Sequence, residues 1–431
     1  MAHDQTRDQE HQGPYHGIRV VELGRFIAAP YCGQLLADGG ADVIKIEPLD
    51  GDDARQNGTR LSATEARQFL NKNRGKRSIA LKLSDPDACR AVRDLIIGAD
   101  VVITNFRPGQ GEKLGLDYDT IRADNPAIIY AENSAFGAKG PLAGKAGMDL
   151  LLLGYTGLAP FDQDGPTALV DPIIDYTAAL LMSWGVATAL FHRERTGIGQ
   201  KLDVSLLQAA LVLQNNSLNH VDIADEWRHD FVAWLKQAFS EGQSLADILA
   251  HRQQLKPAIQ PAYYGFFETK DSYIAIAAGG HGLRVRTAKL LGIDDPSLNS
   301  AEFTPDDIAA FTASMREKTQ TALRQKTTTE WISLFEAEGL AAGEVQLKDQ
   351  VLDDEQCWAN NYFTRVTHDD LGDMTVVAPP VKFSESPLSG DVASPVLGSH
   401  SMQILTEAGL TEEKINQLVA TGAVRLRQSK D

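Results

Sequence analysis

Three carboxylates lie in apolar stretches of the sequence, where an ionised side chain is unusual. Asp149 lies in GMDLLLLG, Asp171 in LVDPII and Asp175 in PIIDYTAALL. Burying a carboxylate without a partner is costly, so each position predicts either a structural or a chemical role. The structural alternatives are a local cap for Asp149, a turn beside a proline for Asp171 and a helix N-cap for Asp175.

A chemical role for Asp175 is compatible with the N-cap. The residues after it, starting at Tyr176, form a long apolar run that predicts a helix. At the N-terminus of a helix, free N–H groups and the macrodipole favour the anionic form of a carboxyl. A poorly hydrated carboxylate that stays ionised is a usable nucleophile. The sequence therefore makes Asp175 a candidate nucleophile, with the cap as the alternative.

Four cations follow one another closely in a strongly acidic protein: Lys72, Arg74, Lys76 and Arg77. One interpretation is a solvated, charged loop. The other is a local anion site, where a phosphate group is held against the negative charge of the rest of the protein.

The segment NFRPG, which contains Asn105 and Phe106, follows an expected strand. Ligands of open α/β sheets bind at the carboxyl ends of parallel strands, so this segment is a candidate binding edge. Phe106 fits two roles there, stacking on a base or packing in the core.

Several common motifs are missing. The first strand-to-helix turn reads LGRFIAAPYCG and lacks the GxGxxG pattern of nicotinamide dinucleotide sites. GKRS does not make a phosphate loop, because Leu70 stands where glycine is needed and Arg77 follows the lysine. HExxH and GxSxG are absent, and the ten histidines have no ligand spacing, so we expect no metal site.

Composition narrows the function classes. The 431 residues carry a net charge of −17, which argues against general nucleic-acid binding and against an anionic membrane surface. Three distant cysteines give no disulfide framework and fit a reducing cytoplasm. The longest uncharged stretch, residues 176–191, is shorter than the roughly 20 residues of a membrane span and predicts a buried helix. Residues 1–16 are polar, and we expect a disordered tail without a signal peptide.

Strand and helix patterns alternate over the first 135 residues, which predicts βαβ units and a mainly parallel sheet. Expected strands are 18–23, 42–46, 78–83, 101–104 and 128–131, and expected helices are 30–38, 86–98, 178–191 and 203–215. A hairpin at 265–277 and helices at 284–291, 306–318 and 329–338 form a second region, and a helix pair at 401–408 and 412–421 ends the chain. The expected domains are the N-terminal part of a large α/β domain (17–220), linker helices (221–254), a small domain (255–342), and a return linker with the C-terminal part of the large domain (343–431).

In these patterns the chain resembles the class III coenzyme A transferases, the family of formyl-CoA transferase, carnitine CoA-transferase and α-methylacyl-CoA racemase. The resemblance lies in GIRVVELGRFIAAPYCGQLLADGGADVIKIE, NRGKRSIALKL, VVITNFRPGQGEKLGLDY, GMDLLLLGYTGL and VDPIIDYTAALLMSWGVATALFHRERTGIGQ. Weaker echoes are YYGFFETKDSYIAIAAG, VLDDEQ and PVLGSHSMQILTEAG. The order and spacing of these segments, over nearly the whole chain after residue 16, carry the resemblance.

The resemblance implies a set of site residues. The catalytic aspartate of the family precedes a long apolar helix that ends in an RxxTGxGQ-like turn, which here makes it Asp175. Asp149 falls where a second acidic residue assists near the thioester in some transferases. Members of the family hold coenzyme A along the sheet edge, and the matching positions are Ile27, Leu81, Asn105, Phe106 and Lys113. Phe106 would lie near the adenine and Lys113 near a phosphate.

The resemblance also implies a fold and an assembly. We expect a Rossmann-like large α/β domain with a parallel sheet, built from both ends of the chain, and a smaller α+β domain in the middle. In this family two subunits thread through each other, so an interlocked homodimer is expected, in the cytoplasm, with coenzyme A as substrate and no metal.

The implied activity is transfer of coenzyme A from an acyl-CoA to a free carboxylic acid, through an aspartyl anhydride and an aspartyl-CoA thioester at Asp175. One alternative is an acyl-CoA racemase or epimerase with Asp175 as base, although Met148 stands where racemases of the family have a histidine. The other is a non-catalytic acyl-CoA-binding protein. Candidates for the acyl pocket are Ala28, Tyr31, Met148 and Tyr155.

Overall fold

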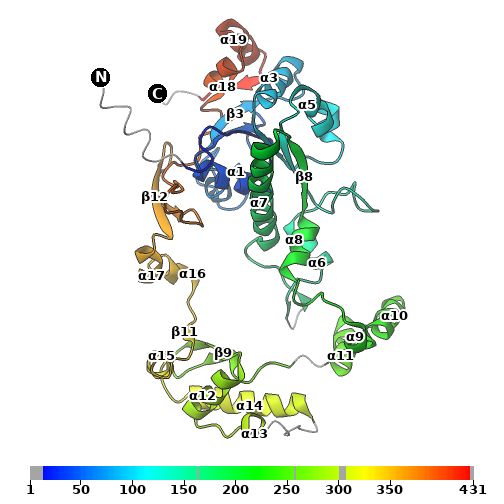
Figure 1. Ribbon diagram of the computed structural model, residues 1–431, viewed down its shortest axis with the longest axis vertical. Helices are drawn as coiled ribbons and strands as arrows, with labels where there is room; N and C mark the ends of the chain where they lie inside the picture. Colours follow the sequence, from blue (N-terminus) through cyan, green and yellow to red (C-terminus); the bar gives the residue numbers. More distant parts are fainter. Residues whose placement is uncertain (1–12, 163–164, 257–258, 300–306, 428–431) are drawn as a thin grey trace. The chain divides into compact units, whose positions relative to one another are not determined.

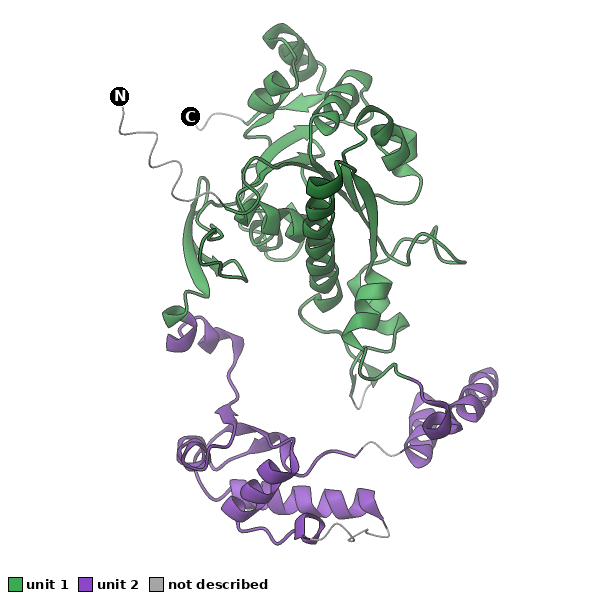
Figure 2. Cartoon of the chain, in the orientation of Figure 1, with its two compact units in different colours: residues 1–219, 358–431 green, residues 220–357 purple. Residues whose placement is uncertain are grey.

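The computed structural model describes residues 13–162, 165–256, 259–299 and 307–427. The chain divides into two compact units, shown in two colours in Figure 2. Unit 1 combines residues 1–219 with 358–431, and unit 2 consists of residues 220–357. The boundaries that the sequence suggests at 254 and 342 stay predictions.

In the described residues, unit 1 is built on a seven-stranded sheet with the order β14-β3-β2-β1-β4-β5-β8. The strands are β1 Arg19–Glu22, β2 Asp42–Glu47, β3 Arg77–Leu81, β4 Val101–Thr104, β5 Ile129–Ser134, β8 Gln200–Ser205 and β14 Val424–Arg425. Neighbouring strands are parallel, except that β14 runs antiparallel to β3. The chain leaves β1 toward β2 and β3 and then returns to the other side of β1 with β4. This reversal creates the switch point at which open α/β sheets bind ligands.

Helices cover both faces of this sheet (Figure 1). On one face lie α1 Ala28–Asp38 and α7 Ile173–Thr196, and on the other α3 Pro86–Ile97, α5 Tyr118–Asp124, α18 Ser401–Glu407 and α19 Glu412–Ala420. Apolar residues of the C-terminal helices, such as Ile404 and Leu418, share one core with β1–β3 and α3. The prediction of a Rossmann-like unit with a parallel sheet, built from both chain ends, is confirmed.

Helix α7 is longer than the 178–191 predicted from its apolar run. It begins at Ile173 and ends where Gly197 takes a left-handed conformation. Its buried residues Ala179, Met182 and Val186 pack against the sheet. By length and composition α7 could also cross a membrane, with a mean hydropathy of 1.4. We interpret it as a core helix because one side of it completes the hydrophobic core of unit 1.

Three sequence predictions differ from the structure. The helix expected at 203–215 begins only at Leu206, because residues 200–205 pair with β5 as β8. The extended linker expected after 342 contains a hairpin of β12 Phe363–His368 and β13 Gly372–Val377. Residues 1–12 of the expected tail lie outside the described residues. Residues 13–16 form a turn, in which the N–H of Tyr15 donates to the carbonyl of Gly39, so the prediction of disorder is wrong for these four residues.

Unit 2 holds the predicted hairpin, β9 Tyr264–Glu268 with β10 Tyr273–Ala277, and β11 Ala342–Glu344 extends it into an antiparallel sheet. Helices α12 His281–Leu291, α14 Ile308–Leu323 and α15 Thr328–Ala337 pack on it around Phe267, Leu323 and Phe335. Earlier in unit 2 come α9 Asp222–Asp225, α10 Trp227–Ser240 and α11 Leu245–Leu255. The remaining short elements of the chain are η1 Asp53–Arg55, α2 Arg67–Leu70, α4 Gln110–Leu114, α6 Asp149–Tyr155, β6 Phe161–Asp162, β7 Gly165–Pro166, α8 Leu206–Leu213, α13 Pro296–Asn299, α16 Lys348–Val351 and α17 Glu355–Ala359.

We predict that Gly199→Ala destabilises unit 1, because Gly199 carries the chain from α7 into β8 against another strand. A Cβ at this position would lie 2.2 Å from the carbonyl oxygen of Ile128 and 2.3 Å from the carbonyl carbon of Ala127, both backbone atoms. We expect a loss of about 1–3 kcal/mol or more, as in overpacked cores, measured by urea unfolding. In the control, Gly98→Ala, the new Cβ meets no atom closer than 3.7 Å. Equal stability of the two variants would contradict this account of the α7–β8 connection.

Candidate active site

The candidate site lies at the carboxyl edge of the sheet, where the loop after β1 meets the loop after β4. Asn105 joins the two loops through both polar atoms of its side chain. Its Oδ1 accepts from the N–H of Arg25 at 2.9 Å, and its Nδ2 donates to the carbonyl of Arg25 at 2.8 Å. Asn105, expected at the coenzyme A edge, therefore fixes the loop that leads into α1.

Phe26, in this loop, has a left-handed backbone with φ of 63°. That conformation is strained for a residue with a bulky side chain and persists only where the surroundings impose it. Here Asp52 imposes it, because its Oδ1 accepts from the N–H of Phe26 at 3.1 Å and from the N–H of Ala54 at 2.9 Å. The next residue, Ile27, opens helix α1. Asp52 thus sets the direction in which α1 begins.

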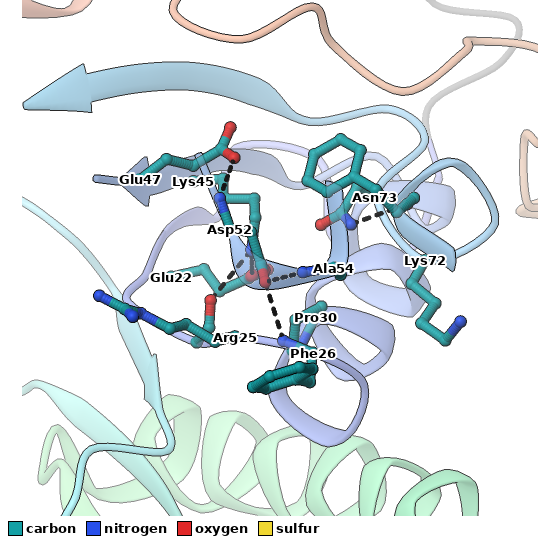
Figure 3. Close-up of polar contacts among 12 residues, drawn as sticks. Glu22, Arg25, Phe26, Pro30, Lys45, Glu47, Asp52, Ala54, Lys72 and Asn73 are labelled. Atoms are coloured by element: carbon teal, nitrogen blue, oxygen red, sulfur yellow. Dashed lines mark hydrogen bonds and ion pairs between the residues drawn. The ribbon is translucent and has the colours of Figure 1, made fainter. Parts of the chain in front are cut away.

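A buried network of charges holds Asp52 in place (Figure 3). Glu22 of β1 is fully buried, and its two oxygens accept from Lys45 at 2.8 Å and from Lys76 at 2.6 Å. Lys45 of β2 also pairs with Asp52 at 2.9 Å. Nearby carboxylates raise the pKa of Lys45 despite its burial. The ammonium of Lys45 therefore stays charged and ties β1 and β2 to the loop.

The same network continues to Arg55, which is fully buried although it is an arginine. Its guanidinium makes a two-pronged contact with Glu47, at 2.7 and 2.9 Å, and a third contact with Glu65 at 2.6 Å. It also lies 3.5 Å from the centre of the Phe69 ring. Such paired and stacked contacts compensate for the removal of the guanidinium from water.

The four clustered cations do not form a solvated loop, because Lys72, Arg74 and Lys76 are buried. They do not form a common phosphate site either, because three of them already pair with carboxylates: Lys76 with Glu22, Arg74 with Asp38, and Arg77 with Asp42. Both interpretations of the cluster are therefore wrong for these three residues. Lys72 behaves differently from the others.

Asp175 is the third residue of α7 and lies beside the beginning of α1. Ala28 of α1 shares a hydrophobic cluster with Ile174 and Ala178. The ring of Tyr31 meets the ring of Tyr176 edge-on, with centroids 4.9 Å apart. The packing of α1 on α7 thus brings the candidate nucleophile to the edge at which the β1–α1 loop ends.

Asp149 caps α7 from a different helix. It is the first residue of α6, and its Oδ2 accepts from the N–H groups of Ile174 at 2.8 Å and Asp175 at 3.1 Å. The local caps expected for Asp149 and Asp175 are therefore wrong, because α7 begins earlier than Tyr176 and its free N–H groups are taken by a residue 25 positions away. Asp171 lies exposed in the turn before α7.

Burial raises the pKa of Asp175 to about 7, and the negative charge of Asp149 adds to the rise, while Lys72 opposes it. The N-terminus of α7 therefore does not hold the pKa of this carboxyl at its ordinary low value, although the carboxyl still ionises near neutral pH. Burial and a neighbouring like charge outweigh the macrodipole. Burial also raises the pKa of Asp149, whereas the two N–H groups that it accepts lower it. Asp175 therefore becomes ionised near neutral pH and is poorly hydrated when it does, which suits a nucleophile or a general base.

The five residues expected at the coenzyme A edge lie at or after the carboxyl ends of β1, β3 and β4. Leu81 is buried in the core, so only its backbone can face a ligand, and Ile27 is nearly as buried. Phe106 packs partly against the core, and Lys113 is exposed on α4. Of the candidates for the acyl pocket, Met148 and Tyr155 are exposed at the two ends of α6. Their contacts with substrate stay predictions.

Residues 15–401 match the family model of CoA-transferase family III. The chain belongs to CoA-transferase family III. It is 32% identical over 408 residues to a succinate–glutarate CoA-transferase of Agrobacterium fabrum, covering 91% of this chain and 95% of the relative. It is 31% identical to an acyl-CoA transferase of Fusarium pseudograminearum, over 96% of this chain and 89% of that protein.

Solved structures agree with this family assignment. The D175A mutant of Rv3272 from Mycobacterium tuberculosis matches with a TM-score of 0.74 at 29% identity, covering 92% of this chain and 99% of that one. A CaiB/BaiF family protein from Brucella suis matches with a TM-score of 0.71, also at 29% identity, and covers 92% of this chain and all of its own. The protein is therefore a CoA-transferase.

Two residues that shape the site of this CoA-transferase, Phe26 and Asp52, could not be identified from the sequence. Phe26 and Asp52 stand in segments that look like ordinary loop sequence, and only the fold brings them into contact. The available signal was weak: an aspartate in the turn DGDDAR after β2, which reads equally well as a solvated turn. Within the described part of the chain, no group of three or more His, Cys, Asp or Glu is placed to hold a metal ion.

We predict that Glu22→Gln strongly destabilises unit 1. The change leaves Lys45 and Lys76 buried with a weaker counter-charge, and breaking a buried ion pair in this way costs about 3–5 kcal/mol. Urea unfolding followed by circular dichroism measures the loss. The matched control is Glu132→Gln in β5, whose partner Lys201 is partly exposed and where we expect a small effect. Similar losses in both variants would show that burial of the network does not govern its contribution.

We predict that Asp175→Asn stabilises the protein at pH 8 more than at pH 5. In the folded protein the pKa of Asp175 is about 7, above its ordinary value of 3.8. Its contribution to stability is therefore present at low pH and is lost as pH rises toward 7, and the amide removes this loss. Melting temperatures of both proteins between pH 5 and pH 8 test it. A difference independent of pH would contradict the raised pKa.

Proposed function

We propose that this protein moves coenzyme A from an acyl-CoA thioester to a free carboxylic acid, with Asp175 as the nucleophile. The observation that carries the proposal is the placement of the Asp175 carboxyl. Asp175 lies at the start of α7, its backbone N–H donates to Asp149, and its neighbour Ile174 packs in one hydrophobic cluster with Ala28 at the beginning of α1. A carboxylate at this place, ionised near neutral pH, supports covalent catalysis.

The reaction consists of four acyl transfers. An oxygen of Asp175 attacks the thioester carbonyl, the C–S bond breaks, and the products are an aspartyl anhydride and the coenzyme A thiolate. The thiolate attacks the carbonyl carbon of Asp175, releases the first acid as a carboxylate and forms the aspartyl-CoA thioester. The acceptor carboxylate then attacks this thioester, which forms a second anhydride and frees the thiolate. Attack of the thiolate on the acceptor's acyl carbon gives the new acyl-CoA and restores Asp175.

Each transfer passes through a tetrahedral oxyanion that needs donors. The first N–H groups of a helix have no carbonyl of their own helix to donate to. The first turn of α1, next to Asp175, supplies such groups, and Asp52 fixes their direction through the strained loop at Phe26. Donors positioned in advance stabilise developing charge without reorganisation. In this proposal Asp149 is a positioning residue that orients the first turn of α7.

Coenzyme A would lie along the carboxyl edge of β1, β3 and β4, against Ile27, Asn105, Phe106 and the backbone of Leu81, with Lys113 near a phosphate. A second copy of the chain would cover the exposed side of α7, which carries Leu180, Trp184 and Phe191. That arrangement gives the homodimer that the resemblance implies.

We predict that Asp175→Ala abolishes transfer while coenzyme A binding is largely retained. Intact-protein mass spectrometry after brief incubation with succinyl-CoA or acetyl-CoA should show a CoA-sized adduct on the wild type and none on the variant. Calorimetry with coenzyme A measures binding by both proteins. The control, Asp171→Ala, removes a nearby exposed carboxylate and should keep the adduct. Turnover by Asp175→Ala would refute the proposal, and entry of solvent deuterium at the α-carbon of an acyl-CoA would favour an epimerase instead.

A further inference from the structure

Lys72 is a buried cation whose charge no nearby protein carboxylate directly neutralises. Only 3% of the surface of Lys72 is exposed to solvent. In the parts of the chain that the structure describes, no carboxylate lies within ion-pairing distance of its ammonium, unlike the ammonium of Lys76. In Figure 3 the Lys72 side chain points away from the buried network around Glu22. The network therefore makes no direct ion pair with this charge, and only Asp52 acts on it, from a distance.

The ammonium of Lys72 is held in place beside the start of α7. It donates to the carbonyl of Gln68 and to Oδ1 of Asn71, both at 3.0 Å. An ammonium has three N–H donors, so these two acceptors leave one for a further partner. Its Nζ lies 5.8 Å from the ring centre of Tyr176, the residue after Asp175. The ammonium is thus anchored next to the reacting carboxyl.

Charge balance changes at this place during the proposed reaction. Burial lowers the pKa of Lys72 to about 8, and the charges of Asp175 and, to a smaller extent, Asp52 oppose that shift. In the free enzyme, therefore, ionised Asp175 is the larger of the two charges that compensate the cation. The anhydride and the aspartyl-CoA thioester are both uncharged, so acylation of Asp175 removes the larger part of this compensation. A buried cation without a counter-charge is unfavourable.

The substrate can restore the balance only through a group that does not react. The reacting carboxyl of the acyl group or acceptor becomes neutral in each anhydride, and the thiolate of coenzyme A exists only between transfers. A second carboxylate on the same acid keeps its charge in every state. An anion of this kind next to Lys72 would be paired throughout the cycle and would complete the third N–H bond.

We infer that Lys72 binds the second carboxylate of the substrate, so that the preferred acids are short dicarboxylic acids and the preferred donors their CoA thioesters. This inference rests on the proposed function of Asp175. Lys72 would then be a specificity-determining residue. Selectivity follows because a monocarboxylic acyl group of the same length leaves the buried ammonium without an anionic partner.

Loading of the enzyme without an acceptor tests this inference. The rate of adduct formation is measured by mass spectrometry at sub-saturating concentrations of glutaryl-CoA and of pentanoyl-CoA, which have the same chain length. We expect the wild type to load from glutaryl-CoA at least tenfold faster. In Lys72→Met and Lys72→Gln this ratio should fall to near one, and in Lys72→Arg it should stay above that of the neutral variants. The control, Lys318→Met, removes an exposed cation of unit 2 and should keep the wild-type ratio.

The ratio separates this inference from the proposed function. If the wild type forms no adduct with any acyl-CoA, the function of Asp175 fails. If the wild type forms adducts without preferring the diacid, or if the preference survives in Lys72→Met and Lys72→Gln, the role of Lys72 is refuted while Asp175 stands. A general loss of rate in the neutral variants, with an unchanged ratio, would assign Lys72 to the ionisation of Asp175 rather than to the substrate, and it also refutes the inference.

Discussion

The contact between Asp52 and the N–H of Phe26 is the constraint on which the rest of the site depends. It holds a left-handed residue immediately before α1, and the direction of α1 determines what lies opposite the start of α7. Asp52 can do this because Lys45 is clamped between it and Glu22, inside the sheet. Strain in the loop is thus opposed by ionic contacts that water does not screen. The buried network therefore fixes the loop before α1 in addition to contributing to stability.

The same rule of charge balance explains why the pKa of the Asp175 carboxyl is raised. At Asp52 and Glu22 the cations are in direct contact, so burial of the carboxylates is compensated. At Asp175 the nearest charges are a like charge, Asp149, and a cation that makes no direct ion pair with it, Lys72. The carboxyl is therefore ready to lose its charge, as the proposed formation of an anhydride would require. A directly paired Asp175 would be a poorer nucleophile, because attack would first have to break that pair.

Local signals in the sequence predict the part of this structure that depends on neighbours along the chain. Alternating strands and helices gave the parallel sheet, and the apolar run after Asp175 gave α7. The side-chain cap of α3 also comes from close neighbours along the chain, because Asp85 accepts from the N–H groups of Asp87 and Ala88. Contacts between distant residues could not be predicted: Asp149 caps a helix 25 positions later, and Lys76 meets Glu22 across 54 positions. In both cases the residue type showed that a partner was needed, but only the fold identifies it.

The four clustered cations show how the need of a buried charge for a partner can point to function. Each is too costly to bury without an anion, and three have an acidic partner in the protein. Among these four residues, Lys72 makes no direct ion pair, and the larger of the two charges that act on it belongs to Asp175, which the proposed reaction neutralises. A fold that needs an anion at this place merely for stability would place a permanent carboxylate there, as it does for Lys76. With Asp175 as the proposed nucleophile, the charge of Lys72 is coupled to the covalent state of the enzyme, and the substrate is the source of a lasting counter-charge.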